Sequence, residues 1–223
     1  MQDYYTRKLA AERLRLCYEI APSRVKRYLE AEVNFVLHKM QANDRVLELG
    51  CGYGRVLSSL APKAKLVIGI DTAFDSLILA KQMLRTASNV KLIQATAADT
   101  GFKDGQFEAV VCIQNGISAF KVSPLKLLRE AVRVTCTGGT VLFSSYAEAF
   151  WPHRLQWFQI QAERGLIGEI DHDATGDGVI VCKDGFRAST FRPEQFAQLA
   201  AVLDMEPNMT EVDDSSLFCE LQL

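Results

Sequence analysis

The sequence predicts an α/β fold built on a doubly wound, mostly parallel sheet. Between residues 46 and 144, five apolar runs alternate with helical segments. The first runs lack the strict alternation of apolar and polar residues that marks a sheet with one solvent-exposed face. They are therefore typical of parallel strands covered by helices on both faces. A glycine-rich turn directly follows the first run, as in nucleotide-binding strand–turn–helix units.

The elements can be placed in order along the chain. Residues 3–40 are expected to form two helices, with Pro22 near the start of the second. Five strands are then predicted over residues 46–49, 66–70, 90–94, 107–113 and 140–144, with helices over 55–60, 73–86 and 124–134. Gly138 and Gly139 are expected to break the chain before the fifth strand.

The second half of the chain has a different pattern. Residues 146–163 form an aromatic-rich insertion, and two short strands are expected within 165–181 around a turn at 174–178. A helix over 193–203 and strands over 205–212 and 216–221 complete the fold. Residues 1–223 therefore read as one domain, in which 146–192 form an inserted cap and the helices within 1–42 are a candidate lid.

Composition excludes several classes of protein. The net charge of −2, from 25 basic and 27 acidic residues, gives no electrostatic footprint for duplex nucleic acid. The six cysteines are scattered without a Cys-x-x-Cys pair, so neither a metal site nor a disulfide framework is predicted. No signal peptide or bilayer-spanning run is visible, and we expect a cytoplasmic protein with no membrane partner.

The glycine turn is the most informative motif. Glu48, Gly50, Gly52 and Gly54 form the pattern Glu-x-Gly-x-Gly-x-Gly between the first strand and the next helix. Glycine permits left-handed backbone and close approach of a ligand. A dinucleotide fold places its third glycine one position later, where this chain has Arg55.

Polar residues follow the next three strands. Asp71 ends the second strand about 20 residues after the turn, which is the usual place of a carboxylate that binds ribose. Asp99 lies just beyond the third strand, where a carboxylate could accept a hydrogen bond from the amine of adenine. Gln114, Asn115 and Gly116 follow the fourth strand, beside the reactive end of such a ligand. Each acid taken alone can equally be a helix cap or a solvated turn residue.

These motifs resemble those of the class I S-adenosylmethionine (SAM) methyltransferases over residues 44–145. The glycine turn is similar to motif I of that family, Asp71 to its ribose acid, Asp99 to its adenine contact, and residues 110–115 to motif IV. The resemblance implies a Rossmann-like sheet of seven strands, the last pair antiparallel, with SAM as cofactor. The residues implied to contact SAM are Glu48, Gly50, Cys51, Gly52, Tyr53, Gly54, Asp71, Thr72, Ala98, Asp99, Gln114, Asn115 and Gly116.

The implied activity is methyl transfer to a small-molecule acceptor. The chain lacks a basic patch for RNA, an appended recognition domain and an Asn-Pro-Pro-Tyr-like motif after the fourth strand. Methylation of a macromolecule (RNA or protein) and a non-catalytic SAM-binding subunit remain alternatives. An NAD-dependent oxidoreductase is disfavoured by Arg55. The acceptor atom and the oligomeric state stay open, because fold does not fix function.

Candidate acceptor residues lie soon after the fifth strand. The resemblance places substrate contacts there, where the chain has Tyr146, Trp151, His153 and Arg154. His153 is the candidate general base, and Arg154 is suited to hold a carboxylate or phosphate. The structural alternatives are an aromatic core and an arginine on a solvated helix face.

Overall fold

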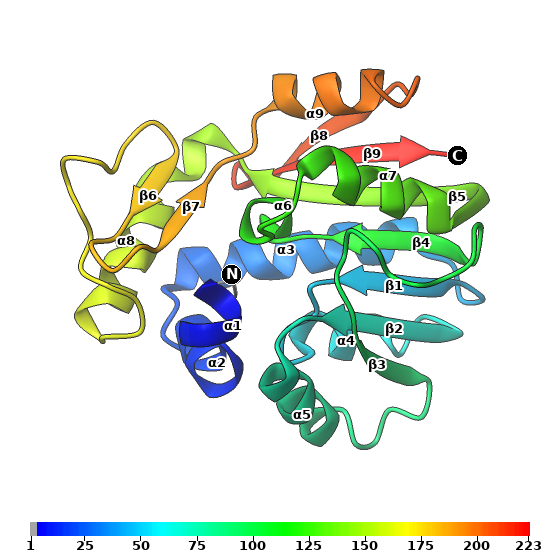
Figure 1. The fold of residues 1–223 in the computed structure, drawn as a ribbon, viewed down its shortest axis with the longest axis horizontal. Coiled ribbons are helices and arrows are strands. Elements are labelled where there is room, and N and C mark those ends of the chain that lie inside the picture. The colour runs from blue at the N-terminus through cyan, green and yellow to red at the C-terminus, as the bar shows by residue number, and fades with distance from the viewer. Residues whose placement is uncertain (1–3) are drawn as a thin grey trace.

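The computed structural model describes residues 4–223 and contains a seven-stranded sheet of order β3-β2-β1-β4-β5-β9-β8 (Figure 1). Five strands run parallel to one another: β1 (Arg45–Leu49), β2 (Leu66–Asp71), β3 (Val90–Gln94), β4 (Phe107–Cys112) and β5 (Thr135–Tyr146). The last pair, β8 (Asn208–Val212) and β9 (Ser216–Gln222), is antiparallel. The predicted doubly wound sheet is confirmed.

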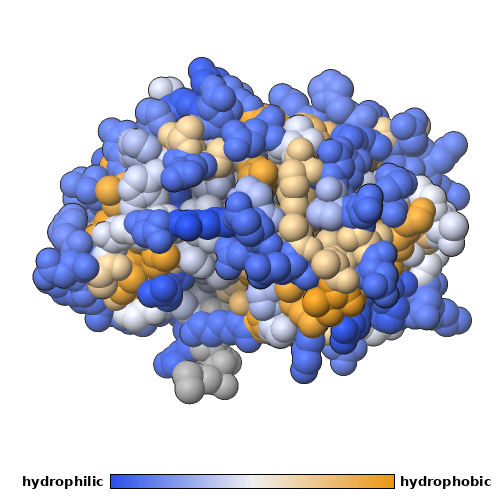
Figure 2. All heavy atoms as spheres, turned by 90° about the horizontal axis from the view of Figure 1, so that it is seen from above, coloured by the Kyte–Doolittle hydropathy of each residue, from blue (hydrophilic) through white to orange (hydrophobic). Residues whose placement is uncertain are grey.

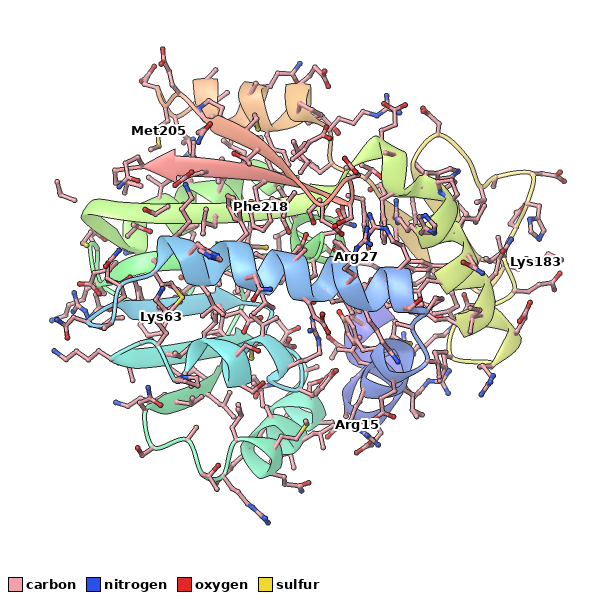
Figure 3. The ribbon with its side chains drawn as sticks, turned by 180° about the vertical axis from the view of Figure 1, so that it is seen from behind. Arg15, Arg27, Lys63, Lys183, Met205 and Phe218 are labelled. Atoms are coloured by element: carbon pink, nitrogen blue, oxygen red, sulfur yellow. The ribbon has the colours of Figure 1, made fainter. Side chains whose placement is uncertain are left out.

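Helices cover both faces of this sheet. One face carries α3 (Ser23–Lys39), α4 (Arg55–Leu60) and α5 (Phe74–Met83), and the other carries α6 (Gly116–Ala119), α7 (Pro124–Val134) and α9 (Pro193–Ala201). Along β1, Val46 packs into the first layer and Leu47 into the second, because successive strand residues point to opposite faces. From behind, α3 crosses the sheet beside the labelled Phe218, whose ring centroid lies 4.2 Å from that of Phe35 (Figure 3).

A third hydrophobic cluster joins the N-terminal helices to the insertion at one end of the molecule (Figure 1). Besides the start of α3, its elements are α1 (Tyr4–Lys8), α2 (Ala11–Glu19), η1 (Glu148–Phe150), α8 (Trp151–Glu163), β6 (Val179–Val181) and β7 (Arg187–Ser189). The Trp157 indole N–H donates to the Cys17 carbonyl at 2.8 Å, and the Ala11 amide N–H donates to Ser76 Oγ of α5 at 2.9 Å. Helix α2 therefore bridges the insertion and the sheet domain.

The N-terminal region differs from the prediction. It contains three helices instead of two, because the chain breaks between α1 and α2, where Ala11 takes a left-handed φ of 49°. The predicted region began at residue 3, and residues 1–3 lie outside the described part of the chain. Pro22 does precede the long helix, as predicted.

The fifth strand and the inserted hairpin also differ from the prediction. β5 continues through Gly138 and Gly139, because the chain bulges there between the pairs formed by Phe107 with Thr135 and by Ala109 with Thr140. The hairpin turn lies between β6 and β7 at residues 182–186, not at 174–178. The short helix α6 was not predicted.

The face of the molecule shown in Figure 2 is mostly polar. In Figure 2, hydrophilic side chains cover most of the visible face, and apolar ones form separate small patches. Across residues 4–223, none of the helices combines the length and the apolar character needed to cross a bilayer.

Candidate functional site

The carboxyl ends of β1, β2 and β4 open onto one cavity of about 160 Å³. Residues from the sheet, from α2 and from α8 line it. The predicted site residues that it brings together are Glu48, Gly50, Cys51, Gly52, Tyr53, Asp71, Thr72, Gln114, Asn115, Gly116 and Tyr146.

Two glycines of the turn face this cavity. Gly50 has φ of 77° and Gly52 has φ of 52°, values at which an L side chain is strained. A Cβ on Gly50 would lie 2.7 Å from the Phe120 ring, and one on Gly52 would lie 3.1 Å from Leu14 Cδ2. The turn is therefore closely covered by Phe120 after α6 and by Leu14 of α2.

Gly54 has a different role. Its φ is 84°, and a Cβ there would lie 2.7 Å from Leu84 Cδ1 and 3.2 Å from Ala80 Cβ. Gly54 is not among the residues that line the cavity. This glycine is required for packing against α5.

Asp71 is held rigidly at the end of β2. Its Oδ2 accepts the Gly52 amide N–H at 2.8 Å, and its Oδ1 accepts the Ala73 amide N–H at 2.8 Å. These bonds tie the second strand end to the glycine turn. Beside it, the exposed Thr72 hydroxyl lies 3.2 Å from the Thr6 hydroxyl of α1.

Glu48 and Arg55 bring two buried, unsatisfied groups to the cavity. Glu48 is 5% exposed, and its Oε2 has no hydrogen-bond partner among residues 4–223. Burial raises the pKa of Glu48 to about 8; Arg55 lowers it and Asp71 raises it by smaller amounts. Arg55 Nη2 is likewise buried without a described partner, while its guanidinium carbon lies 4.7 Å from the Tyr18 ring centroid.

The loop after β4 is fixed by a buried carboxyl from α3. Gln114 and Asn115 both have φ of 59°, a left-handed conformation uncommon outside glycine. The backbone N–H of Gln114 donates to Glu32 Oε2 at 2.6 Å and to Ser144 Oγ at 2.8 Å. Ser216 Oγ donates to the other Glu32 oxygen. Burial raises the pKa of Glu32 to about 7, against the lowering effect of these bonds.

Asn115 connects the same loop to the insertion. Its side-chain N–H donates to the Ser189 carbonyl of β7 at 2.9 Å. Ser145 Oγ donates to Asn115 Oδ1 at 2.8 Å and accepts the Phe191 amide N–H at 2.7 Å. The β4 loop and the cap are therefore one hydrogen-bonded unit.

The remaining predicted cofactor residues lie elsewhere. Ala98 and Asp99 line a separate shallow hollow together with Lys121, Ser123 and Lys126. Asp99 is exposed there. The structure does not bring these two residues into the cavity at the glycine turn.

The predicted acceptor residues are divided between two cavities. Tyr146 lines the first cavity and also a second one of about 610 Å³, which Trp151 and Arg154 line as well. His153 is exposed and lines neither of them; its ring lies 5.8 Å from that of Phe150. The candidate base is thus outside the cavity at the strand ends.

Arg154 is a buried structural cation. It is fully buried, so the alternative of a solvated helix face is wrong. Its Nη1 donates to the Gly178 carbonyl and to Thr190 Oγ1, both at 2.8 Å, and its Nη2 donates to the Ala188 carbonyl at 3.0 Å. Burial lowers its pKa. The guanidinium fastens the cap hairpin to α8.

One wall of the first cavity was not predicted from the sequence. Trp157, Phe158 and Gln161 of α8 line it, and Gln161 is only 3% exposed. Trp157 and Gln161 are four residues apart, so they share one helix face. That spacing could have predicted a shared wall, but aromatic residues in this insertion are equally typical of a hydrophobic core.

The residues of the cavity fit the chemistry of SAM. Glu48 Oε2 and Arg55 Nη2 have no hydrogen-bond partner among residues 4–223, and an amino-acid moiety carries the complementary ammonium and carboxylate. Asp71 stands beside them as an acceptor for ribose hydroxyls.

Comparison with known proteins supports this reading. Residues 46–139 match a family profile described as a methyltransferase domain. Among curated proteins, the ubiquinone biosynthesis O-methyltransferase of Vibrio parahaemolyticus is 29% identical over 117 residues, 51% of this chain and 49% of that protein. The chain thus aligns with about half the length of this relative.

Solved structures share the fold. A SAM-dependent methyltransferase from Methanosarcina mazei aligns over 84% of this chain and 96% of its own, with a TM-score of 0.63 and 18% identity. The N-methyltransferase NodS from Bradyrhizobium japonicum, in complex with S-adenosyl-L-homocysteine, aligns over 97% and 94%, with a TM-score of 0.62 and 15% identity. The chain is thus similar to methyltransferases in sequence over residues 46–139, and it shares the fold of these solved SAM-dependent methyltransferases over most of its length.

Proposed function

We propose that this protein transfers a methyl group from SAM to a small-molecule acceptor in the cavity at the ends of β1, β2 and β4. One observation carries the proposal: Glu48 Oε2 and Arg55 Nη2 are buried beside the glycine turn without a hydrogen-bond partner among residues 4–223. Unsatisfied buried polar groups are rare in native proteins, and a bound ligand satisfies them.

The residues divide the work of binding. Gly50 and Gly52 let the cofactor approach the main chain, and Asp71 receives the ribose hydroxyls. Glu48 and Arg55 hold the ammonium and carboxylate of the methionyl end. SAM supplies a methyl group already activated by its sulfonium, so the protein acts mainly by orienting the acceptor. The loop at Gln114 is held in place for this purpose by Glu32.

We further propose that residues 1–223 act as one domain in which α1 and α2 form a lid. The cavity of about 160 Å³ is smaller than the roughly 300–1,000 Å³ typical of small-molecule sites. Leu14 of α2 lies over Gly52, and the strained Ala11 begins that helix. Outward rotation of α2 around Ala11 would widen the cavity above the glycine turn.

An oxygen acceptor is the proposal that the sequence relatives favour, because their printed activity is O-methylation. Methylation of a macromolecule has no comparable support among these relatives. Trp157, Phe158 and Gln161 of α8 line the same cavity as the glycine turn, so we assign the acceptor to this first cavity, beside α8. The cap residues Trp151 and Arg154 line the second cavity.

Calorimetric titration with SAM, S-adenosylhomocysteine and NADH tests the proposal. We expect binding of both adenosyl compounds and none of NADH. Binding of NADH alone would replace the methyltransferase assignment with an oxidoreductase. SAM binding without transfer to any acceptor, until a partner protein is added, would favour a non-catalytic subunit.

A further inference from the structure

The formally charged groups around the first cavity come from the sheet domain. Among the described residues that line it, they are Glu48 in β1, Arg55 at the start of α4 and Asp71 at the end of β2. The proposed function assigns all three to SAM. The side formed by α2, α8 and the cap presents no formal charge, so it would not compensate a charged acceptor for its lost hydration.

The uncharged side is made largely of aromatic rings. Tyr18 lies 5.7 Å from Trp157 and 6.0 Å from Tyr53 between ring centroids, and Trp157 lies 5.6 Å from Phe158. The Trp157 indole N–H is already donated to the Cys17 carbonyl. Such walls favour a flat, apolar molecule that packs against ring faces and edges.

One polar side chain interrupts this aromatic wall. Gln161 is buried, with only 3% of its surface exposed, and it lines the cavity one helical turn from Trp157. No hydrogen bond of its side-chain amide is found among residues 4–223. A glutamine amide both donates and accepts, so it is complementary to a hydroxyl group.

We infer that Gln161 binds the hydroxyl of an uncharged aromatic acceptor held between α2 and α8. This inference rests on the proposed function and names its substrate class. Gln161 is a positioning residue: it holds the hydroxyl oxygen toward the glycine turn. During transfer that oxygen forms a bond to the methyl carbon as the carbon–sulfur bond breaks, and the hydroxyl proton leaves to solvent.

The test measures binding of three matched probes to the complex with S-adenosylhomocysteine: phenol, 4-hydroxybenzoate and tyramine. They share a phenol ring and differ in charge. We expect phenol to bind at least about tenfold more tightly than the anion or the cation, since charge must be desolvated on this side. Toluene, which lacks the hydroxyl, should also bind about tenfold more weakly than phenol.

Gln161→Met is the variant that isolates the amide, because methionine keeps an unbranched side chain of similar length. It should abolish the preference for phenol over toluene and leave the dissociation constant of S-adenosylhomocysteine unchanged. Gln156→Met, at an exposed position of the same helix, is the matched control and should change neither. If Gln161→Met fails to fold, Gln161→Glu keeps the shape, and its added charge should weaken phenol binding as the pH rises.

The outcomes separate the inference from the proposed function. Preference for a charged probe, no phenol binding by the wild-type complex, or an unchanged preference for phenol over toluene in Gln161→Met would overturn the inference. Each of these results is compatible with tight binding of S-adenosylhomocysteine. Absence of that binding in the wild-type protein would instead refute the proposed function.

Discussion

Binding of SAM should release a proton from Glu48. Burial holds the pKa of this carboxyl near 8, so at neutral pH the group is mostly protonated before the ligand arrives. The ligand brings a positive sulfonium and an ammonium group to the cavity, and positive charge favours the carboxylate. Ligand binding and ionisation of Glu48 are therefore linked.

The size of the effect follows from that pKa. A group with a pKa of about 8 is roughly 0.9 protonated at pH 7 and about 0.1 protonated at pH 9. Ionising it at pH 7 costs roughly 1.4 kcal/mol, which corresponds to about a tenfold loss of affinity relative to pH 9. The Glu48 contribution should therefore favour SAM binding about tenfold more at pH 9 than at pH 7, and the difference between the wild-type protein and Glu48→Gln separates it from the titration of the SAM α-ammonium group.

Isothermal titration calorimetry in phosphate and in Tris buffer measures the proton directly, because the two buffers differ in ionisation enthalpy. We expect release of about 0.9 proton per SAM at pH 7, falling to about 0.1 at pH 9. Glu48→Gln should remove this proton release at pH 7 together with the Glu48 part of the change in affinity. A wild-type heat that is the same in both buffers at pH 7 would refute the reasoning, as would undiminished proton release by Glu48→Gln.

Four further outcomes are expected. Asp71→Ala should weaken SAM binding by about 1–3 kcal/mol in calorimetry, and an unchanged dissociation constant would count against its assignment. Gly54→Ala should lower thermal stability by about 2 kcal/mol more than Gly101→Ala, because both glycines have positive φ but only the first would clash; equal losses would contradict the packing argument. Glu32 has a raised pKa of about 7, so the folded state keeps the Glu32 proton to a higher pH than the unfolded chain does. The folded state therefore loses stability as the pH rises from about 4.5 to 7. Glu32→Gln should flatten that part of a profile of melting temperature against pH, and an unaltered profile would contradict the raised pKa. His153→Ala should leave turnover within twofold of wild type, given its exposed position outside both cavities; a large loss of kcat would restore its role as a base.

The sheet was predictable because its signals are local. Apolar runs bounded by glycine and aspartate located β1 to β4 within one or two residues, and Pro124 marked the start of α7. The errors occurred where distant pairing decides the local structure. Gly138 and Gly139 look like a strand break, but pairing with β4 and β9 keeps them inside β5.

The site was predictable in part for the same reason. Glu48 and Asp71 stand at strand ends, and the strand order of the family brings such ends together. Glu32 and Gln161 come from helices that meet the site only through tertiary packing, so no spacing relative to the glycine turn identifies them. Arg154 shows the limit most clearly, because nothing in its sequence neighbourhood indicates a fully buried cation.

Arg154 holds the cap mainly through bonds that do not depend on the side chains of the hairpin. Two of its three bonds to the cap go to main-chain carbonyls, which every amino acid provides, and only the third depends on a hydroxyl. The hairpin can therefore exchange most of its side chains without detaching from α8. Substitutions in the hairpin can therefore reshape the second cavity while the glycine turn and the end of β2 stay untouched.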